Sequence, residues 1–167
     1  MAKARSLTER EWNRKAAAQE LNLVWKLLTK PARTPAEVDR MIHAAHASRY
    51  HWGLAGTPTN VAVGEWQISR VYAVLRRPEP ALYHARRCLQ ICRRNGIGDF
   101  ALAYAYEALA RAHGIARHRR ERDRNLALAW RAGETIREAE DRGLLGSDLR
   151  TIPGGRRLAP RTRAATA

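Results

Sequence analysis

Residues 65 to 91, EWQISRVYAVLRRPEPALYHARRCLQI, form the stretch that most restricts how this chain can fold. Apolar residues recur every three or four positions on both sides of the segment RPEP, a spacing typical of two amphipathic helices joined by a short turn. Small and aromatic residues lie where two closely packed helices need them. Because a short connection makes neighbouring helices antiparallel, the stretch predicts a helical hairpin.

The same signals predict six helices along the chain, and therefore an all-α fold. A capping pattern, SLTE at residues 6–9, begins the first helix, and TPAE at residues 34–37 begins the second. Asp99 is expected to cap the fifth helix, and the charge run RHRRERDR at residues 117–124 is expected to be a solvated turn. The predicted helices cover about residues 8–29, 35–54, 57–75, 79–94, 99–117 and 123–142, which makes three consecutive hairpins.

A single helical domain is expected over residues 1–150, because 167 residues suffice to bury a core. After Gly143 the helical period fades, and residues 151–167 contain arginine but no acidic residue, so we expect a disordered basic tail there. No stretch approaches the roughly 20 apolar residues of a membrane span, and the N-terminus lacks the apolar run of a secretory signal. These features favour a cytoplasmic location. The two cysteines, Cys88 and Cys92, are expected to be buried thiols.

Five positions of the middle hairpin follow a known repeat pattern, in which Leu, a small residue, Tyr, Ala and Ala recur at fixed spacings. In this chain they are occupied by Ile68, Ser69, Tyr72, Ala81 and Cys88. The hairpin therefore resembles a tetratricopeptide (TPR) repeat. Small residues at three of these positions would let the two helices approach closely, and Tyr72 would fill the gap towards the next hairpin.

The resemblance also has departures. Glu65 replaces the Trp of the repeat and Ala85 replaces its second aromatic residue. The next hairpin repeats the pattern with Leu109, Ala110 and His113, but the 41 residues from Ile68 to Leu109 exceed the usual period, which suggests an overlong connecting turn. The resemblance implies three TPR-like hairpins in a right-handed array. Residues 35–150 are similar as a whole to small TPR-like proteins of high-GC bacteria.

TPR arrays bind extended peptides along a concave surface formed by the first helix of each hairpin. The resemblance therefore implies a groove lined by Val63, Trp66, Arg70 and Val74 in the middle repeat and by Tyr104, Glu107 and Arg111 in the next. The aromatic ring of Trp66 and the guanidinium of Arg70, four residues apart, suit a carboxylate or another planar anion. The alternative is that Trp66 packs in the core and Arg70 is solvated.

A polar stripe on the second predicted helix is the other candidate site. Asp39, His43, His46 and Tyr50 fall within about 60° of one another on a helical wheel. Such a stripe could bind a divalent metal through His43 and His46, with Asp39 in support, or perform acid–base chemistry. The alternative is a set of exposed or core-satisfied histidines, since the two are three apart and zinc helices usually space them by four. Glu65 and His84 would be further ligands only if the fold brings them near.

Positive charge is the third feature that bears on function. The net charge is +15, and arginine supplies 27 of the 31 basic residues. Arg86 and Arg93, like Arg87 and Arg94, are seven apart and would form a basic ridge able to follow a phosphate backbone. A GC-rich coding bias would also produce this composition.

No catalytic motif accompanies these features: the sequence has no phosphate-binding glycine loop, no HExxH and no CxxC. We therefore expect a non-catalytic scaffold that binds a protein or peptide partner. The alternatives are a nucleic-acid or anion binder that uses the arginine ridge, and a metal-dependent enzyme or sensor built on His43 and His46. Apolar flanks at either end of the array would favour a homo-oligomer.

Overall fold

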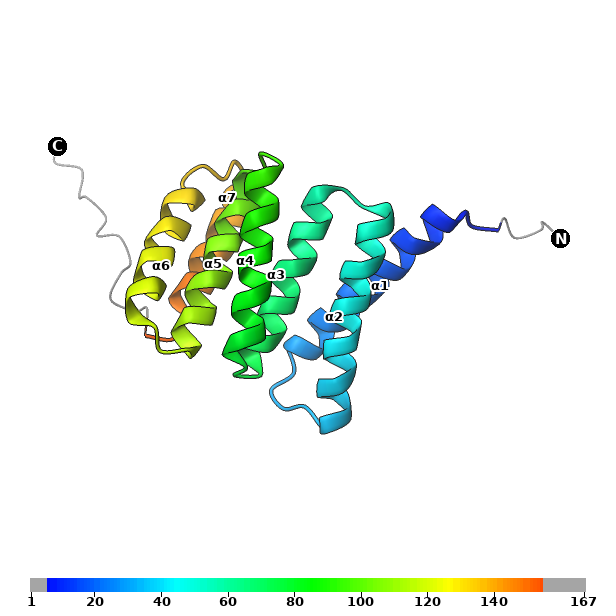
Figure 1. Ribbon diagram of the computed structural model, residues 1–167, viewed down its shortest axis with the longest axis horizontal. Coiled ribbons are helices and arrows are strands. Elements are labelled where there is room, and N and C mark those ends of the chain that lie inside the picture. The colour runs from blue at the N-terminus through cyan, green and yellow to red at the C-terminus, as the bar shows by residue number, and fades with distance from the viewer. Residues whose placement is uncertain (1–5, 155–167) are drawn as a thin grey trace.

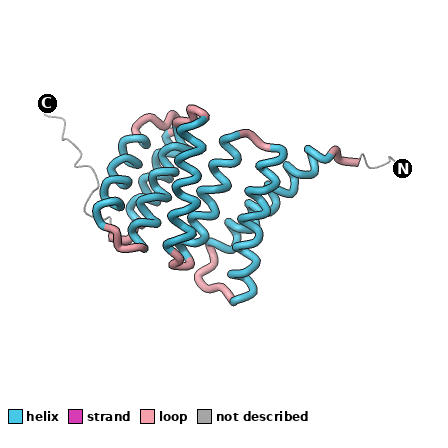
Figure 2. The backbone as a smooth tube through the Cα atoms, viewed as in Figure 1, coloured by secondary structure: helices cyan, strands magenta, loops and turns pink. Residues whose placement is uncertain are grey.

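The computed structural model describes residues 6–154, and all regular secondary structure in that range is α-helical, which confirms the predicted fold class. Short connections join consecutive helices (Figures 1 and 2). There are seven helices in this range rather than six: α1 Glu9–Leu28, α2 Pro35–Ala55, α3 Pro58–Val74, α4 Pro78–Arg94, α5 Asp99–Ile115, α6 Arg119–Gly133 and α7 Ala139–Arg150.

Capping chemistry explains where the first three helices begin. Thr8, Thr34 and Thr57 each accept a hydrogen bond from the backbone N–H three residues later, and the side chain at that position bonds back to the cap. The box of α1 is formed by Thr8 and Glu11, two residues later than the predicted SLTE pattern. Asp99 does not cap α5: it is the first helical residue, after Gly98.

The prediction of one helix over residues 123–142 is wrong. α6 begins at Arg119, inside the expected charged turn, and ends at Gly133, and α7 follows from Ala139. At Gly133 a Cβ would lie 2.6 Å from Cδ2 of Leu145, so the glycine lets the Leu145 side chain of α7 pack against the end of α6 without shifting. Ile136 in the connection is buried, which fixes the turn against the core.

The helices pack in two layers. α1 packs on α2, α3 on α4, and α5 on α6, and the odd-numbered helices also contact one another along the chain. Within residues 6–154, α2, α4 and α6 make no such contacts with each other. The odd helices are therefore the more closely spaced, inner layer of a curved molecule, and the even helices form the outer layer (Figure 1).

The hairpins α3/α4 and α5/α6 are spaced by one constant interval. From Pro58 to Asp99, and again from Pro78 to Arg119, the distance is 41 residues. Their turns have the same geometry, since Arg76 and Arg117 have φ of 58° and 62°. The N–H that follows each of them donates to the carbonyl five residues before it, at 2.9 and 3.0 Å. The predicted overlong turn before α6 is therefore wrong, because both connections have three residues.

The small residues of the middle hairpin lie at its helix–helix contact, as their size predicts. Ser69, Ala81 and Cys88 are buried, and the Ser69 hydroxyl donates to the Ala81 carbonyl at 2.9 Å. The Tyr72 ring packs beside residues of α4 and α5, and its hydroxyl lies 3.2 Å from Nε2 of His46 in α2. It therefore also joins the middle hairpin to the preceding one.

Both cysteines are buried free thiols, as predicted. None of the helices in the described part of the chain combines the length and apolarity needed to cross a membrane. The packed core extends past α7 to Ile152, which is 2% exposed. The predicted basic tail lies, beyond residue 154, outside the described residues.

Candidate binding groove

A buried network of hydrogen bonds links α3 and α5 on the inner layer. Its centre is the Glu107 carboxylate, which is fully buried. This carboxylate accepts a hydrogen bond from Trp66 Nε1 at 3.1 Å, from Arg70 at 3.0 Å and from Arg111 Nε at 2.6 Å. Two guanidinium groups therefore share one buried carboxylate, and the indole N–H of Trp66 is already donated.

α7 completes this network from the other side. Asp148 accepts a hydrogen bond from Arg70 at 2.8 Å and from the Tyr104 hydroxyl at 3.1 Å, and Arg111 donates to its carbonyl at 2.9 Å. Burial and then the Asp148 carboxylate raise the pKa of Tyr104 well above its usual value. Burial opposes the charge on Arg70, but Glu107 and Asp148 outweigh it and raise the pKa of that guanidinium. Both groups are thus held in their protonated forms.

The fold therefore brings most of the predicted groove residues together, but their polar groups form hydrogen bonds mainly with one another. Trp66, Tyr104, Glu107 and Arg111 are all at most 9% exposed, and the carboxylate next to Arg70 belongs to α7. Val74 lies apart from them, in a different surface depression near Arg76 and Pro153. The anion-binding pair expected of Trp66 and Arg70 is thus satisfied within the chain.

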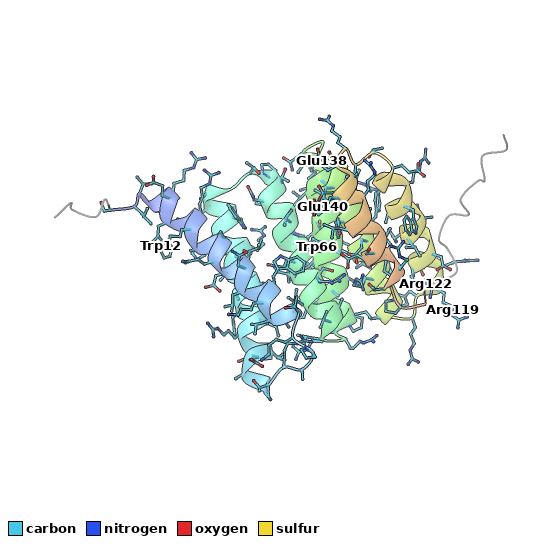
Figure 3. The ribbon with its side chains drawn as sticks, turned by 180° about the vertical axis from the view of Figure 1, so that it is seen from behind. Trp12, Trp66, Arg119, Arg122, Glu138 and Glu140 are labelled. Carbon is cyan, nitrogen blue, oxygen red and sulfur yellow. The ribbon has the colours of Figure 1, made fainter. Side chains whose placement is uncertain are left out.

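An open pocket lies on the inner layer, between α1 and α7. In Figure 3 the side chain of Trp66 lies in the space that these two helices flank. The pocket has a volume of about 410 Å³. We call it the α1–α7 pocket, and its lining residues are Leu21, Trp25, Val63, Trp66, Gln67, Phe100, Tyr104, Leu144 and Asp148.

Four aromatic rings form a continuous wall of the α1–α7 pocket. The ring centroids of Trp25 and Trp66 are 5.5 Å apart, those of Trp66 and Tyr104 are 5.2 Å apart, and those of Tyr104 and Phe100 are 4.4 Å apart. The first two separations lie in the range of about 4.5–7 Å of favourable aromatic pairs, and the third lies at its lower edge. Trp25 and Leu144, which are 38% and 53% exposed, lie on opposite sides of the pocket, on α1 and α7.

Sequence reasoning found Val63, Trp66 and Tyr104 of this lining and missed the rest. Trp25 belongs to a helix that matches the repeat pattern only loosely, and Leu144 to a segment in which no helix was expected. A usable signal for α7 was present, because Leu145, Leu149 and Ile152 recur at helical spacing and all three are buried.

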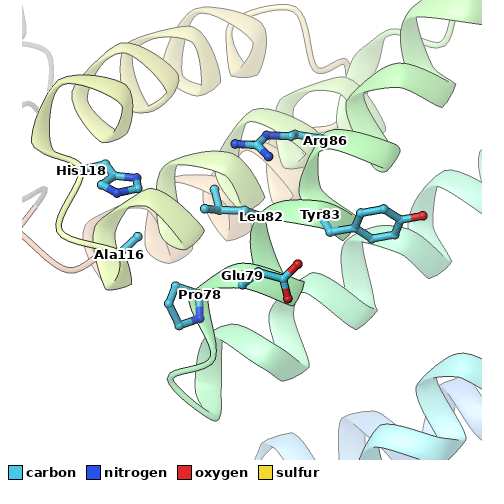
Figure 4. A pocket seen from close by; sticks show the side chains of 7 residues that line it. All are labelled: Pro78, Glu79, Leu82, Tyr83, Arg86, Ala116 and His118. Atoms are coloured by element: carbon cyan, nitrogen blue, oxygen red, sulfur yellow. The ribbon is translucent and has the colours of Figure 1, made fainter.

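A second pocket, of about 350 Å³, lies on the outer side, between the start of α4 and the α5–α6 turn. Figure 4 shows Leu82 and Arg86 of α4 pointing across it towards Ala116 and His118. Tyr83 at its edge is 55% exposed. Its lining has no continuous aromatic wall, so it is the weaker candidate for an apolar ligand.

The histidine stripe of α2 faces outwards. Asp39, His43, His46 and Tyr50 are all exposed, and within residues 6–154 no group of three or more His, Cys, Asp or Glu side chains is arranged to hold a metal ion. The four residues are therefore not assembled into a metal site. Metal binding and acid–base chemistry by this stripe gain no support from the fold.

The fold does bring Glu65 and His84 together, at 2.7 Å, with Arg49 Nε at 2.9 Å from the same carboxylate. Burial alone would raise the pKa of Glu65, but the hydrogen bonds from His84 and Arg49 outweigh it and lower that pKa. This cluster joins α2, α3 and α4 as a structural ion pair. His46 lies beside it, with its ring centroid 5.3 Å from that of His84.

The arginine ridge of α4 is exposed in part. Arg86, Arg93 and Arg94 are exposed, whereas Arg87 is half-buried with its Nε 3.9 Å from Glu65. The Arg93 guanidinium reaches the Tyr106 hydroxyl at 3.4 Å. Binding of nucleic acid along this ridge stays a prediction.

Comparison with known proteins adds no assignment to this geometry: no protein-family model, no curated protein and no solved structure matches the chain.

Proposed function

We propose that this protein is a non-catalytic helical-repeat binding protein of the TPR type, and that it holds an apolar side chain of a peptide or protein partner in the α1–α7 pocket. The observation that carries the proposal is the aromatic wall of that pocket, contributed by α1, α3 and α5. The constant interval between the hairpins α3/α4 and α5/α6 supports the repeat architecture.

The size and chemistry of the pocket fit one or two side chains of a partner. Its volume of about 410 Å³ falls within the range of about 300–1,000 Å³ typical of ligand sites. Large side chains buried in such pockets supply most of the affinity of protein interfaces. An exposed Trp25 and an exposed Leu144 at its two sides would gain apolar burial when a partner covers them.

The partner group is expected to be apolar rather than anionic. Within residues 6–154 the pocket lining contains no basic residue, and Arg70 on α3 is already paired with Glu107 and Asp148. A carboxylate from a partner would therefore meet the Asp148 carboxylate in the pocket wall and no unpaired cation. This differs from the peptide-carboxylate site that the sequence suggested.

Selection of peptides tests the proposal directly. A random-peptide phage library panned on the immobilised full chain should enrich peptides with a shared large apolar residue. Their affinity should fall by about tenfold or more in Trp25→Ala and in Leu144→Asp, because both changes remove apolar contact at the pocket. Trp66 is left unchanged because it also bonds to Glu107 inside the fold.

Tyr83→Ala is the matched control, since Tyr83 is an exposed aromatic residue on the outer layer. It should bind the selected peptides as the natural chain does. Failure to enrich any peptide, or equal binding by all three variants, would contradict the proposal.

A further inference from the structure

One buried polar atom on the wall of the α1–α7 pocket has no partner. Gln67 is 1% exposed, and its Nε2 donates to the Leu21 carbonyl of α1 at 3.1 Å. Its Oε1 is the one buried side-chain nitrogen or oxygen without a hydrogen bond in the described part of the chain. Leaving a buried amide oxygen unpaired is unfavourable, so this atom favours any donor that reaches it.

The hydrogen-bond donors of Trp66 and Tyr104 in the pocket wall already have partners within the protein. The indole N–H of Trp66 is donated to Glu107, and the hydroxyl of Tyr104 is donated to Asp148. Neither can serve a ligand without losing a bond to a carboxylate. Among Trp66, Gln67 and Tyr104, the group left without a partner is therefore an acceptor, Oε1 of Gln67. A ligand that complements it must carry a hydrogen-bond donor.

We infer that the side chain held in this pocket is a tryptophan of the partner, whose indole N–H donates to Oε1 of Gln67. This rests on the proposed function and adds its specificity. Indole is planar and apolar enough to stack against Trp25 and Trp66, and its nitrogen is a donor only. A phenol would bring an oxygen that also needs a donor, and a phenyl group would leave Oε1 unpaired.

Entry of the indole requires a small movement of the wall. Oε1 is closed to solvent, and Leu21 and Trp25 are the residues of α1 that line the pocket together with Gln67. Trp25 is 38% exposed, so its ring lies at the surface of this wall and is the group that would move outwards when the indole enters. The arriving indole then lies between the displaced Trp25 ring and Trp66.

Two probes that differ only at the donor test this inference. N-acetyl-tryptophan amide carries the indole N–H, and N-acetyl-3-benzothienylalanine amide has the same shape with sulfur in its place. Each is titrated into the ¹⁵N-labelled full chain, and the side-chain resonances of Gln67, Trp25 and Trp66 are followed by NMR. We expect the indole probe to bind about three- to tenfold more tightly, the effect of one net hydrogen bond.

Gln67→Met should abolish this preference, because it keeps the length of the side chain and removes the amide oxygen. Trp25→Ala should weaken both probes by the same factor and leave their ratio unchanged, and it serves if Gln67→Met does not fold. Equal binding of the two probes to the natural chain, or a preference that survives Gln67→Met, would overturn the inference while the peptide selection could still support the proposed function. Failure of both probes to shift any pocket resonance would also overturn it.

Discussion

Glu107 shows how far a single buried charge organises this molecule. Its carboxylate is 0% exposed, accepts from Trp66, Arg70 and Arg111, and therefore orients side chains on both α3 and α5. The helical pattern places Glu107 on the same face as Tyr104 and Arg111, which is why the sequence predicts it as a groove residue. Its burial results from the packing of α3 and α7 around α5. The pattern of a single helix does not predict this packing.

Replacing this charge should destabilise the fold strongly. Glu107→Gln leaves Arg70 and Arg111 without their shared anion, and breaking a buried ion pair from one side costs about 3–5 kcal/mol. The free energy of unfolding measured by urea denaturation should fall by that amount. Glu140→Gln, at an exposed position in the first turn of α7, is the control and should change it by less than about 1 kcal/mol. A loss for Glu107→Gln no larger than the control's would contradict the role of Glu107.

At the scale of helices, the sequence predicted the first five well because their end signals are local. A Thr cap or a Pro in the first turn acts within four residues, and the bounds of α1 to α5 agree with prediction within about two residues. The predicted sixth helix failed because its true end depends on Leu145, a distant residue that packs on Gly133. The missed α7 then hid the side of the pocket formed by Leu144 and Asp148.

Two glycines inside helices should respond in opposite directions to the same change. A Cβ at Gly64 of α3 would lie 3.0 Å from Cγ and 3.2 Å from Cα of Arg49 in α2, so Gly64→Ala crowds Arg49 and requires a small shift of its backbone and side chain. We expect a loss of about 1–3 kcal/mol from this crowding. A Cβ at Gly143 of α7 would meet nothing within 4 Å, so Gly143→Ala should gain about 0.5–1 kcal/mol from helix propensity.

Thermal unfolding followed by circular dichroism measures both variants. Equal changes of Tm in the two would show that the close approach of α2 and α3 does not depend on Gly64.

At the scale of the whole molecule, stability is expected to depend on pH through groups buried between hairpins. His113 of α5 is 8% exposed, and its Nδ1 lies 3.3 Å from Nδ1 of His118. Burial, and then the charge of His118, lower the pKa of His113, while Glu121 opposes the shift and Arg86 adds to it. The unfolded chain therefore binds this proton more readily than the folded chain does.

Stability should consequently fall as the pH drops below about 6.5, the ordinary value of a histidine. Tm measured at about pH 5.5 should be lower than at about pH 7.5, and His113→Gln should reduce that difference. Part of the difference should remain, because partial burial of the His46 ring against its neighbours, and then the charge of His84, also lower the pKa of His46. An undiminished difference in His113→Gln would show that His113 is not a source of the pH dependence.

The candidate site could be predicted only in part, because it depends on the shape of the whole molecule. Trp66 and Tyr104 come from helices whose register the repeat pattern fixes. Trp25 and Leu144 face the same pocket only because the inner layer curves enough to bring α1 and α7 to its two sides. The spacing of residues within a helix carries no information about that curvature.

The constant 41-residue interval has a consequence for how such a chain can be lengthened. The segment from Pro58 to Gly98 begins at one hairpin and ends just before an equivalent one, so a second copy placed after Gly98 would meet a matching junction on each side. Its turn would bring its own left-handed residue at the position of Arg76. The molecule is in this sense modular: the middle of the array can grow by whole units while α1 and α7 remain its two ends.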